Sequence, residues 1–247
     1  MKCLVERGAD VKARTDEGRT ALMAHIGDPE IAGLLIDKGA DVNAKTREGT
    51  TALMLAVGDA GIESIRLLLD RGADINARDN DGRTAFYSLE RRSPPAFVLN
   101  NQIALLLIER GLDVNAKDKN DFTTLMLAVK CDLVATVKAL VEKGADIHFR
   151  TKSGHNALLV AFTSDFRDPE IQKFLIEQGS DVRVKNQNGF TPLMGTRNAG
   201  IVRLLIAKGA DVDARHANGK TALLMNAAEC SENFEAFKVL ADNGADL

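Results

Sequence analysis

Residues 39 to 51 read Gly-Ala-Asp-Val-Asn-Ala-Lys-Thr-Arg-Glu-Gly-Thr-Thr, and this stretch decides the fold because its outline returns along the whole chain. Twelve positions separate its first glycine from its last threonine. The same step recurs from Gly8 to Thr20, Gly39 to Thr51, Gly72 to Thr84, Gly111 to Thr123, Gly144 to Asn156, Gly179 to Thr191 and Gly209 to Thr221. Self-similarity of this kind is typical of solenoids, in which each unit packs only on its neighbours.

The twelve-residue step never changes, whereas the rest of each repeat does. Successive glycines lie 31, 33, 39, 33, 35, 30 and 35 residues apart, so all of the variation falls between the threonine and the next glycine. The third interval is the longest and contains Pro94 and Pro95, which forbid a continuous helix. We expect a protruding loop around 90–96. The sixth interval is the shortest, and residues 194–200 leave space for barely more than one turn of inner helix, which predicts a soft joint.

The variable part of each repeat predicts two helices. Thr51 supplies a capping oxygen at the start of a short apolar run over 51–57, which predicts an inner helix packed on two sides. Residues 62–69 have apolar side chains at helical spacing, and Gly72 suits the left-handed position that ends a helix. Asp28 and Asp168, each followed by Pro and Glu, are typical helix starts.

The constant part has no helical period, and its Asp, Asn and Gly residues are those of turns, so each twelve-residue step predicts an extended hairpin. No single repeat can bury both of its helices. Stability therefore comes from stacking, with each buried leucine worth about 1.5–3 kcal/mol.

These residues resemble the ankyrin repeat family, whose pattern runs Gly-x-Thr-Pro-Leu-His-x-Ala-Ala, then a second helix, then Gly-Ala-Asp-Val-Asn. The resemblance covers essentially the whole chain and implies an all-α ankyrin-repeat solenoid of helix-turn-helix units with β-hairpin fingers. The family's histidine is missing, which removes its hydrogen bond to the threonine. Its place is taken by Met23, Met54, Tyr87, Met126, Leu159, Met194 and Leu224. The Thr-Ala-Leu-Met variant looks like bacterial members.

We expect one solenoid over 1–247. Its units are a partial repeat 1–15 and repeats 16–46, 47–78, 79–117, 118–150, 151–185, 186–215 and 216–247. Both ends fall inside the pattern, so we expect the chain to be part of a longer array. We also expect a monomer, unless the two uncapped ends pair with one another.

Composition indicates a soluble, reduced protein that binds without chemistry. The net charge of −3 gives no case for nucleic acid, no apolar run approaches a membrane span, and no signal peptide opens the chain. Cys3, Cys131 and Cys230 are odd in number and far apart, which favours reduced thiols and a cytoplasmic location. We find no zinc, calcium, phosphate-loop or nucleophile motif, and so expect no metal, no cofactor and no enzyme activity.

Every finger carries a basic residue six positions before its threonine or Asn156. These residues are Arg14, Lys45, Arg78, Lys117, Arg150, Lys185 and Arg215, and we call them the basic row. The basic row would either face an acidic partner or be offset by nearby Asp, and the second interpretation is favoured.

The fingers also carry aromatic residues where the hairpin returns to the inner helix. Phe122 and Phe190 immediately precede a threonine, and His155 occupies the same position before Asn156. A phenylalanine there either packs on the adjacent finger or is held out as an interface anchor. Our hypothesis is a concave partner-binding surface to which seven residues contribute, namely Tyr87, Arg91, Arg92, Phe122, Phe149, His155 and Phe190.

The expected function is a noncatalytic scaffold that binds another protein on its fingers and inner helices. One alternative is the targeting arm of a longer effector or enzyme whose catalytic part lies outside this segment. The other is a structural spacer without a partner. Fold alone does not choose among them.

Overall fold

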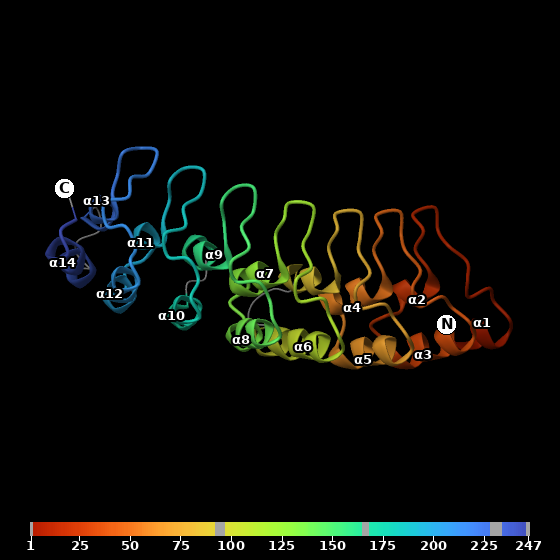
Figure 1. Cartoon of the computed structure of the whole chain (residues 1–247). Coiled ribbons are helices and arrows are strands. Elements are labelled where there is room, and N and C mark those ends of the chain that lie inside the picture. The colour runs from red at the N-terminus through yellow and green to blue at the C-terminus, as the bar shows by residue number, and fades with distance from the viewer. Residues whose placement is uncertain (1, 92–96, 165–167, 228–233, 246–247) are drawn as a thin grey trace. The chain divides into compact units, whose positions relative to one another are not determined.

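The structure is a computed structural model that describes residues 2–91, 97–164, 168–227 and 234–245. These residues form two compact units, Met1–Lys119 and Asn120–Leu247, which we call the first and second units. Within each unit, inner helices form one row, outer helices form a second row, and the fingers project beside the inner row (Figure 1). The repeat boundaries given above stay a prediction.

In the first unit the predicted order of finger, inner helix and outer helix is confirmed. The inner elements are α2 (Ala21–Ala24), α4 (Ala52–Asp59) and the 3-10 helix η1 (Ala85–Arg91). The outer helices are α1 (Lys2–Glu6), α3 (Pro29–Asp37), α5 (Ile62–Asp70) and α6 (Phe97–Glu109).

The second unit repeats the same order. Its inner helices are α7 (Thr124–Lys130), α9 (Ala157–Thr163), α11 (Pro192–Gly195) and α13 (Ala222–Ala227). Its outer helices are α8 (Val134–Glu142), α10 (Pro169–Glu177), α12 (Ala199–Ala207) and α14 (Phe234–Asp242). With four residues, α11 confirms the expected one-turn inner helix of the sixth interval.

The threonine at the base of each finger caps the inner helix as predicted in most repeats. The hydroxyl of Thr51 accepts a bond of 3.3 Å from the amide of Met54, and the side chain of Asn156 accepts one of 2.8 Å from Leu159. Asp28 and Asp168 cap α3 and α10. These bonds satisfy amides that the first helical turn leaves unpaired.

Two threonines do not cap. The hydroxyls of Thr84 and Thr191 are buried without a hydrogen-bond partner among the described residues. After Thr84 the expected α-helical inner helix is wrong, because the chain winds as η1, with the amide of Tyr87 bonding the carbonyl of Thr84 over 3.1 Å. This bond spans three residues, which is the 3-10 pattern. The expected loop around 90–96 lies mostly outside the described residues.

Two sets of leucines form the core of each unit. One leucine per inner helix has at most 1% of its surface exposed, and these are Leu22, Leu53, Leu125, Leu158, Leu193 and Leu223. From α3 onward, one leucine per outer helix has none exposed, and these are Leu35, Leu68, Leu107, Leu140, Leu175, Leu205 and Leu240. Since a solenoid repeat packs on its neighbours, stacking buries what one repeat alone would leave in water.

The fingers are hairpins held mainly by turns, and the pairings Arg14 with Thr20 and Lys45 with Thr51 are isolated bridges. Neighbouring fingers within a unit are joined at their tips by backbone bonds. The amide of Asn80 donates to the carbonyl of Glu48 over 2.9 Å, and the amide of Ala217 donates to that of Asn188 over 2.7 Å. These backbone bonds therefore link each finger to the next within a unit.

Candidate partner-binding surface

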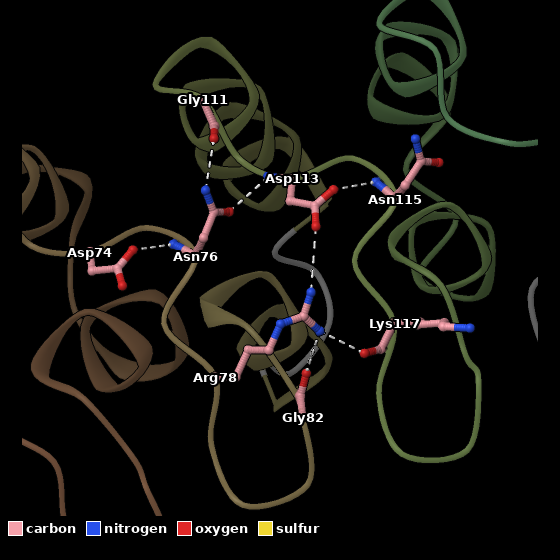
Figure 2. Close-up of polar contacts among 8 residues, drawn as sticks. All are labelled: Asp74, Asn76, Arg78, Gly82, Gly111, Asp113, Asn115 and Lys117. Atoms are coloured by element: carbon pink, nitrogen blue, oxygen red, sulfur yellow. Dashed lines mark hydrogen bonds and ion pairs between the residues drawn. The ribbon is translucent and has the colours of Figure 1, made fainter.

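Several members of the basic row contact the neighbouring finger, as Figure 2 shows for Arg78. Its guanidinium donates over 2.8 Å to the carbonyl of Lys117 and over 3.1 Å to that of Gly82, and it lies 3.4 Å from the carboxylate of Asp113. Two positions earlier, the side chain of Asn76 donates through Nδ2 to the carbonyl of Gly111 over 3.1 Å, and its Oδ1 accepts from the backbone amide of Asp113 over 2.8 Å. Side chains of one finger thus bind backbone groups of the next finger.

Other members of the basic row make the same kind of contact. Arg14 donates to the carbonyl of Lys45 over 3.1 Å, and the ammonium of Lys45 donates to the carbonyl of Arg78 over 2.8 Å. In the second unit the guanidinium of Arg150 pairs with Asp181. The ion pairs of Arg78 with Asp113 and of Arg150 with Asp181 support the interpretation that nearby Asp offsets the row. Its exposed ion pairs add little stability individually.

A cleft in the second unit brings together two residues that the sequence selected separately. Phe122 and His155 line it from consecutive fingers. We call it the Phe122 cleft, and its volume is about 310 Å³. Its lining residues are Asn120, Phe122, Lys130, Thr151, Ser153, His155, Val160, Thr163 and Ser164. Five of these residues lie on the two fingers, and Lys130 lies at the end of α7. Val160, Thr163 and Ser164 lie on or directly after α9.

His155 is held in this cleft by hydroxyl groups of its own finger. The hydroxyl of Thr151 accepts from the amide of His155 over 3.1 Å, and the hydroxyls of Thr151 and Ser153 lie 2.9 Å apart. Ser153 in turn lies 3.1 Å from Nδ1 of His155. Burial lowers the pKa of His155, so its ring is neutral near pH 7 and presents one donor and one acceptor nitrogen.

Three further lining residues of the Phe122 cleft are polar. The hydroxyl of Thr163 donates to the carbonyl of Leu159 over 3.1 Å, and the hydroxyl of Ser164 donates to that of Val160 over 2.9 Å. Lys130 stands in the last turn of α7, where the helix dipole favours a cation.

Phe149 and Phe190 are half-buried. The ring of Phe190 meets the ring of His216, on the next finger, edge-on with centroids 6.5 Å apart. For Phe190 this contact supports packing on the adjacent finger.

Tyr87 lines a different cleft, in the first unit, of about 220 Å³ between η1 and the fingers. Only 8% of its surface is exposed, and burial raises its pKa. Tyr87 therefore shapes this cleft rather than projecting from it. Arg91 ends η1, and Arg92 lies outside the described residues.

Sequence reasoning missed Lys130, Val160, Thr163 and Ser164, which line the Phe122 cleft. They lie on or directly after the inner helices α7 and α9, whereas most of the candidate residues lie on fingers. Lys130 carried one signal, since it is a charged residue directly after the apolar run 124–129.

The described residues contain no group of three or more metal-binding side chains, and none of their helices is long and apolar enough to cross a membrane. Cys3 and Cys131 form no disulfide bond among the described residues, and Cys230 lies outside them.

Comparison with known proteins finds ankyrin repeats along the chain. A family model described as ankyrin repeats (3 copies) matches residues 1–87, 96–186 and 158–247. Among solved structures, 545 chains match. One is the crystal structure of the human ASB11 ankyrin repeat domain, which is similar with a TM-score of 0.72 and 22% identity over 93% of this chain and 100% of that one. At this identity the likeness shows the fold. No curated protein matches the chain significantly.

Proposed function

Since the chain belongs to the ankyrin repeat family, whose repeats form protein–protein interaction modules, we propose that it binds another protein on its fingers and inner helices and performs no chemistry itself. A cytoplasmic location and a bacterial source stay predictions.

The observation that carries the proposal is the meeting of Phe122 and His155 in one cleft. Phenylalanine lies there half-buried, with apolar area that a partner covers. Aromatic residues in such positions dominate interface energetics, because covering them removes a large apolar area from water. The polar groups around Phe122 provide the hydrogen bonds that orient a partner.

The remaining residues of the proposed surface have different roles. Phe149 and Phe190 extend the surface along neighbouring fingers of the second unit, and Phe190 also braces the next finger. Tyr87 supports the cleft of the first unit from beneath. Arg91 and Arg92 stay part of the predicted surface, with Arg92 outside the described residues.

The test is quantitative capture from a lysate of the organism that encodes the chain, read by mass spectrometry. The combined variant Phe122→Ala, Phe149→Ala, Phe190→Ala should lose the captured partner while its circular-dichroism spectrum stays helical. Phe174→Ala is the matched control, because Phe174 is also half-buried but lies on the outer helix α10. Undiminished capture by the combined variant would overturn the proposal.

A further inference from the structure

Another cleft in the second unit is lined mainly by residues of the fingers 179–191 and 209–221. We call it the Lys185 cleft, and its volume is about 340 Å³. Its charged lining residues are Arg183, Lys185, Asp211, Asp213 and Arg215. Three of these side chains are cations and two are carboxylates near pH 7, so the cleft carries an excess of one positive charge. This excess favours an anionic group on the molecule that enters the cleft.

Lys185 belongs to the basic row but differs from Arg78 in its contacts. The guanidinium of Arg78 pairs with Asp113 in the next repeat, and two further arginines of the row pair in the same way. Asp211 holds the position of Asp113 in the repeat after Lys185. The ammonium of Lys185 nevertheless has no hydrogen-bond or ion-pair partner among the described residues. Lys185 is exposed, so its charge is available to a ligand.

The backbone amide of Asp211 is a second donor in the Lys185 cleft. In the first unit, the equivalent amide of Asp113 donates to the side-chain oxygen of Asn76. Arg183 takes the place of the asparagine before Asp211, and its Nε donates over 2.8 Å to the carbonyl of Gly209. A guanidinium has no acceptor, so the amide of Asp211 is left without one among the described residues.

The guanidinium of Arg183 and the amide of Asp211 are neighbours. A single side chain, that of Asn76, spans the two equivalent backbone groups in the first unit. Because Arg183 binds one of these groups in its own repeat, its positive charge lies next to the other. The cleft therefore offers a backbone donor beside a cation, at a point where the first unit already holds an acceptor oxygen.

We propose that the Lys185 cleft binds the carboxylate of an Asp or Glu side chain of the partner protein. One carboxylate oxygen accepts from the amide of Asp211, where an asparagine oxygen sits in the first unit, and the other meets the ammonium of Lys185. A carboxylate carries the single negative charge that balances the cleft, whereas a phosphoryl group carries about 1.5 to 2. The inference rests on the proposed function and names a group that the partner presents.

The first experiment is selection of random short peptides displayed on phage against the full chain and two variants. The wild type should enrich Asp or Glu at one position of the selected peptides. Lys185→Glu should enrich Lys or Arg in their place, because the charge of the cleft is reversed. Lys238→Glu is the matched control and should select as the wild type does, since Lys238 is also exposed but lies on the outer helix α14, outside the cleft.

Binding of one selected peptide, labelled with fluorescein and followed by anisotropy, gives the magnitudes. Changing its acid to Asn or Gln should weaken binding to the wild type about threefold to fivefold. In Lys185→Gln the same change should weaken binding by less than about twofold, because the ion pair is already lost. Phosphoserine in place of the acid should bind no more tightly than the acid.

Two substitutions of Arg183 test the role of the Asp211 amide. Arg183→Asn adds an acceptor that occupies this amide, so it should weaken binding of the acidic peptide about tenfold. Arg183→Met removes the same charge without adding an acceptor and should weaken binding about threefold. A helical circular-dichroism spectrum in both variants would exclude unfolding as the cause.

Four outcomes would overturn the inference. They are the same peptides selected by wild type and Lys185→Glu, equal binding of the acidic and amide peptides, equal weakening by the two Arg183 variants, and no enriched peptide on the wild type. Each leaves the proposed function standing if the combined phenylalanine variant still loses its captured partner. Undiminished capture by that variant would instead remove the proposed function.

Discussion

The two units use different side chains for the same task of tying one finger to the next. In the first unit, Asn43 and Asn76 each donate to a glycine carbonyl of the next repeat and accept from the amide of an Asp there. In the second unit, His148 and Arg183 hold this position, and Arg183 only donates, over 2.8 Å, to the carbonyl of Gly209. An arginine has no acceptor, so it makes half of the asparagine bridge.

The finger tips differ in how closely they pack on the next finger, and they do so within the units as well as between them. A β-carbon added to Gly189 or Gly154 of the second unit would lie 2.6 or 2.8 Å from a carbonyl oxygen of the next finger. At Gly82 of the first unit the nearest atom would be 3.4 Å away. At Gly49 of the first unit, however, the nearest backbone atoms would be 2.9 Å away, so close backbone contact at the tips occurs in both units and only the side-chain bridges at the finger base distinguish them.

The largest expected difference lies between the inner helices α4 and α11. Helix α4 has eight residues and a capped start, whereas α11 has four and follows the uncapped Thr191. Local opening is cheap where few bonds must break, so the amides of 193–195 should exchange at least about a hundredfold faster than those of 53–58. Hydrogen exchange read by mass spectrometry measures this ratio. Uniform protection across 186–215 would contradict the soft joint.

The next largest difference is expected between alanine substitutions at two finger-tip glycines, Gly189 and Gly82. At both Gly189 and Gly82 the backbone has φ near +75°, which costs a residue with a β-carbon about 1–2 kcal/mol. Gly189→Ala adds a clash with the carbonyl of Arg215, so it should lower the free energy of unfolding by about 2–3 kcal/mol and Gly82→Ala by about 1. Urea denaturation gives both values. Equal losses of unfolding free energy in the two variants would mean that Gly189 and Gly82 are packed equally closely.

Replacing the finger-base bridges should have a smaller effect. Asn76→Ala removes a donor and an acceptor and should cost about 1 kcal/mol, whereas Arg183→Ala removes one donor at an exposed site and should cost about half of that. The same urea experiment applies, with Arg183→Asn as a gain-of-bridge variant. If Arg183→Asn is no more stable than Arg183→Ala, the two-sided bridge does not explain the difference between the units.

The smallest expected effect is a pH dependence confined to the second unit. The folded-state pKa of His155 lies below its unfolded value of about 6.5, so its stabilisation is complete above that pH and is lost as the pH falls toward the folded pKa. The loss should stay under about 1 kcal/mol, because the ring is partly exposed. Hydrogen exchange at pH 7.5 and pH 5.5 should show the change in the wild type. His155→Gln should remove it, and an unchanged pH dependence in that variant would exclude His155 as the source.

The sequence predicted the fold well because its signals are local. A threonine before an apolar run and a glycine after one act within a single helix, and both recur at each repeat. The shortness of α11 was countable for the same reason. The 3-10 winding of η1 was missed because nothing near Thr84 in the sequence distinguishes it from the threonines that cap.

The candidate surface could be predicted only in part. Phe122 and His155 share a cleft because they occupy the same position in consecutive repeats, which the sequence makes visible. Lys130 lines the same cleft because α7 ends beside it, and Tyr87 is buried because of how η1 packs. Neither placement follows from position in the repeat. For the basic row the sequence favoured offset by nearby Asp, but it could not show that carbonyl groups, which every residue has, are partners as well.

The backbone bonds between finger tips leave the choice of tip side chains open. An amide and a carbonyl are present whichever amino acid stands at Glu17, Glu48 or Asn188, so these bonds survive substitution there. Tip positions other than the glycines are therefore places where mutations accumulate at low cost, and where a randomised library would vary the recognition surface while the stacked helices keep their geometry.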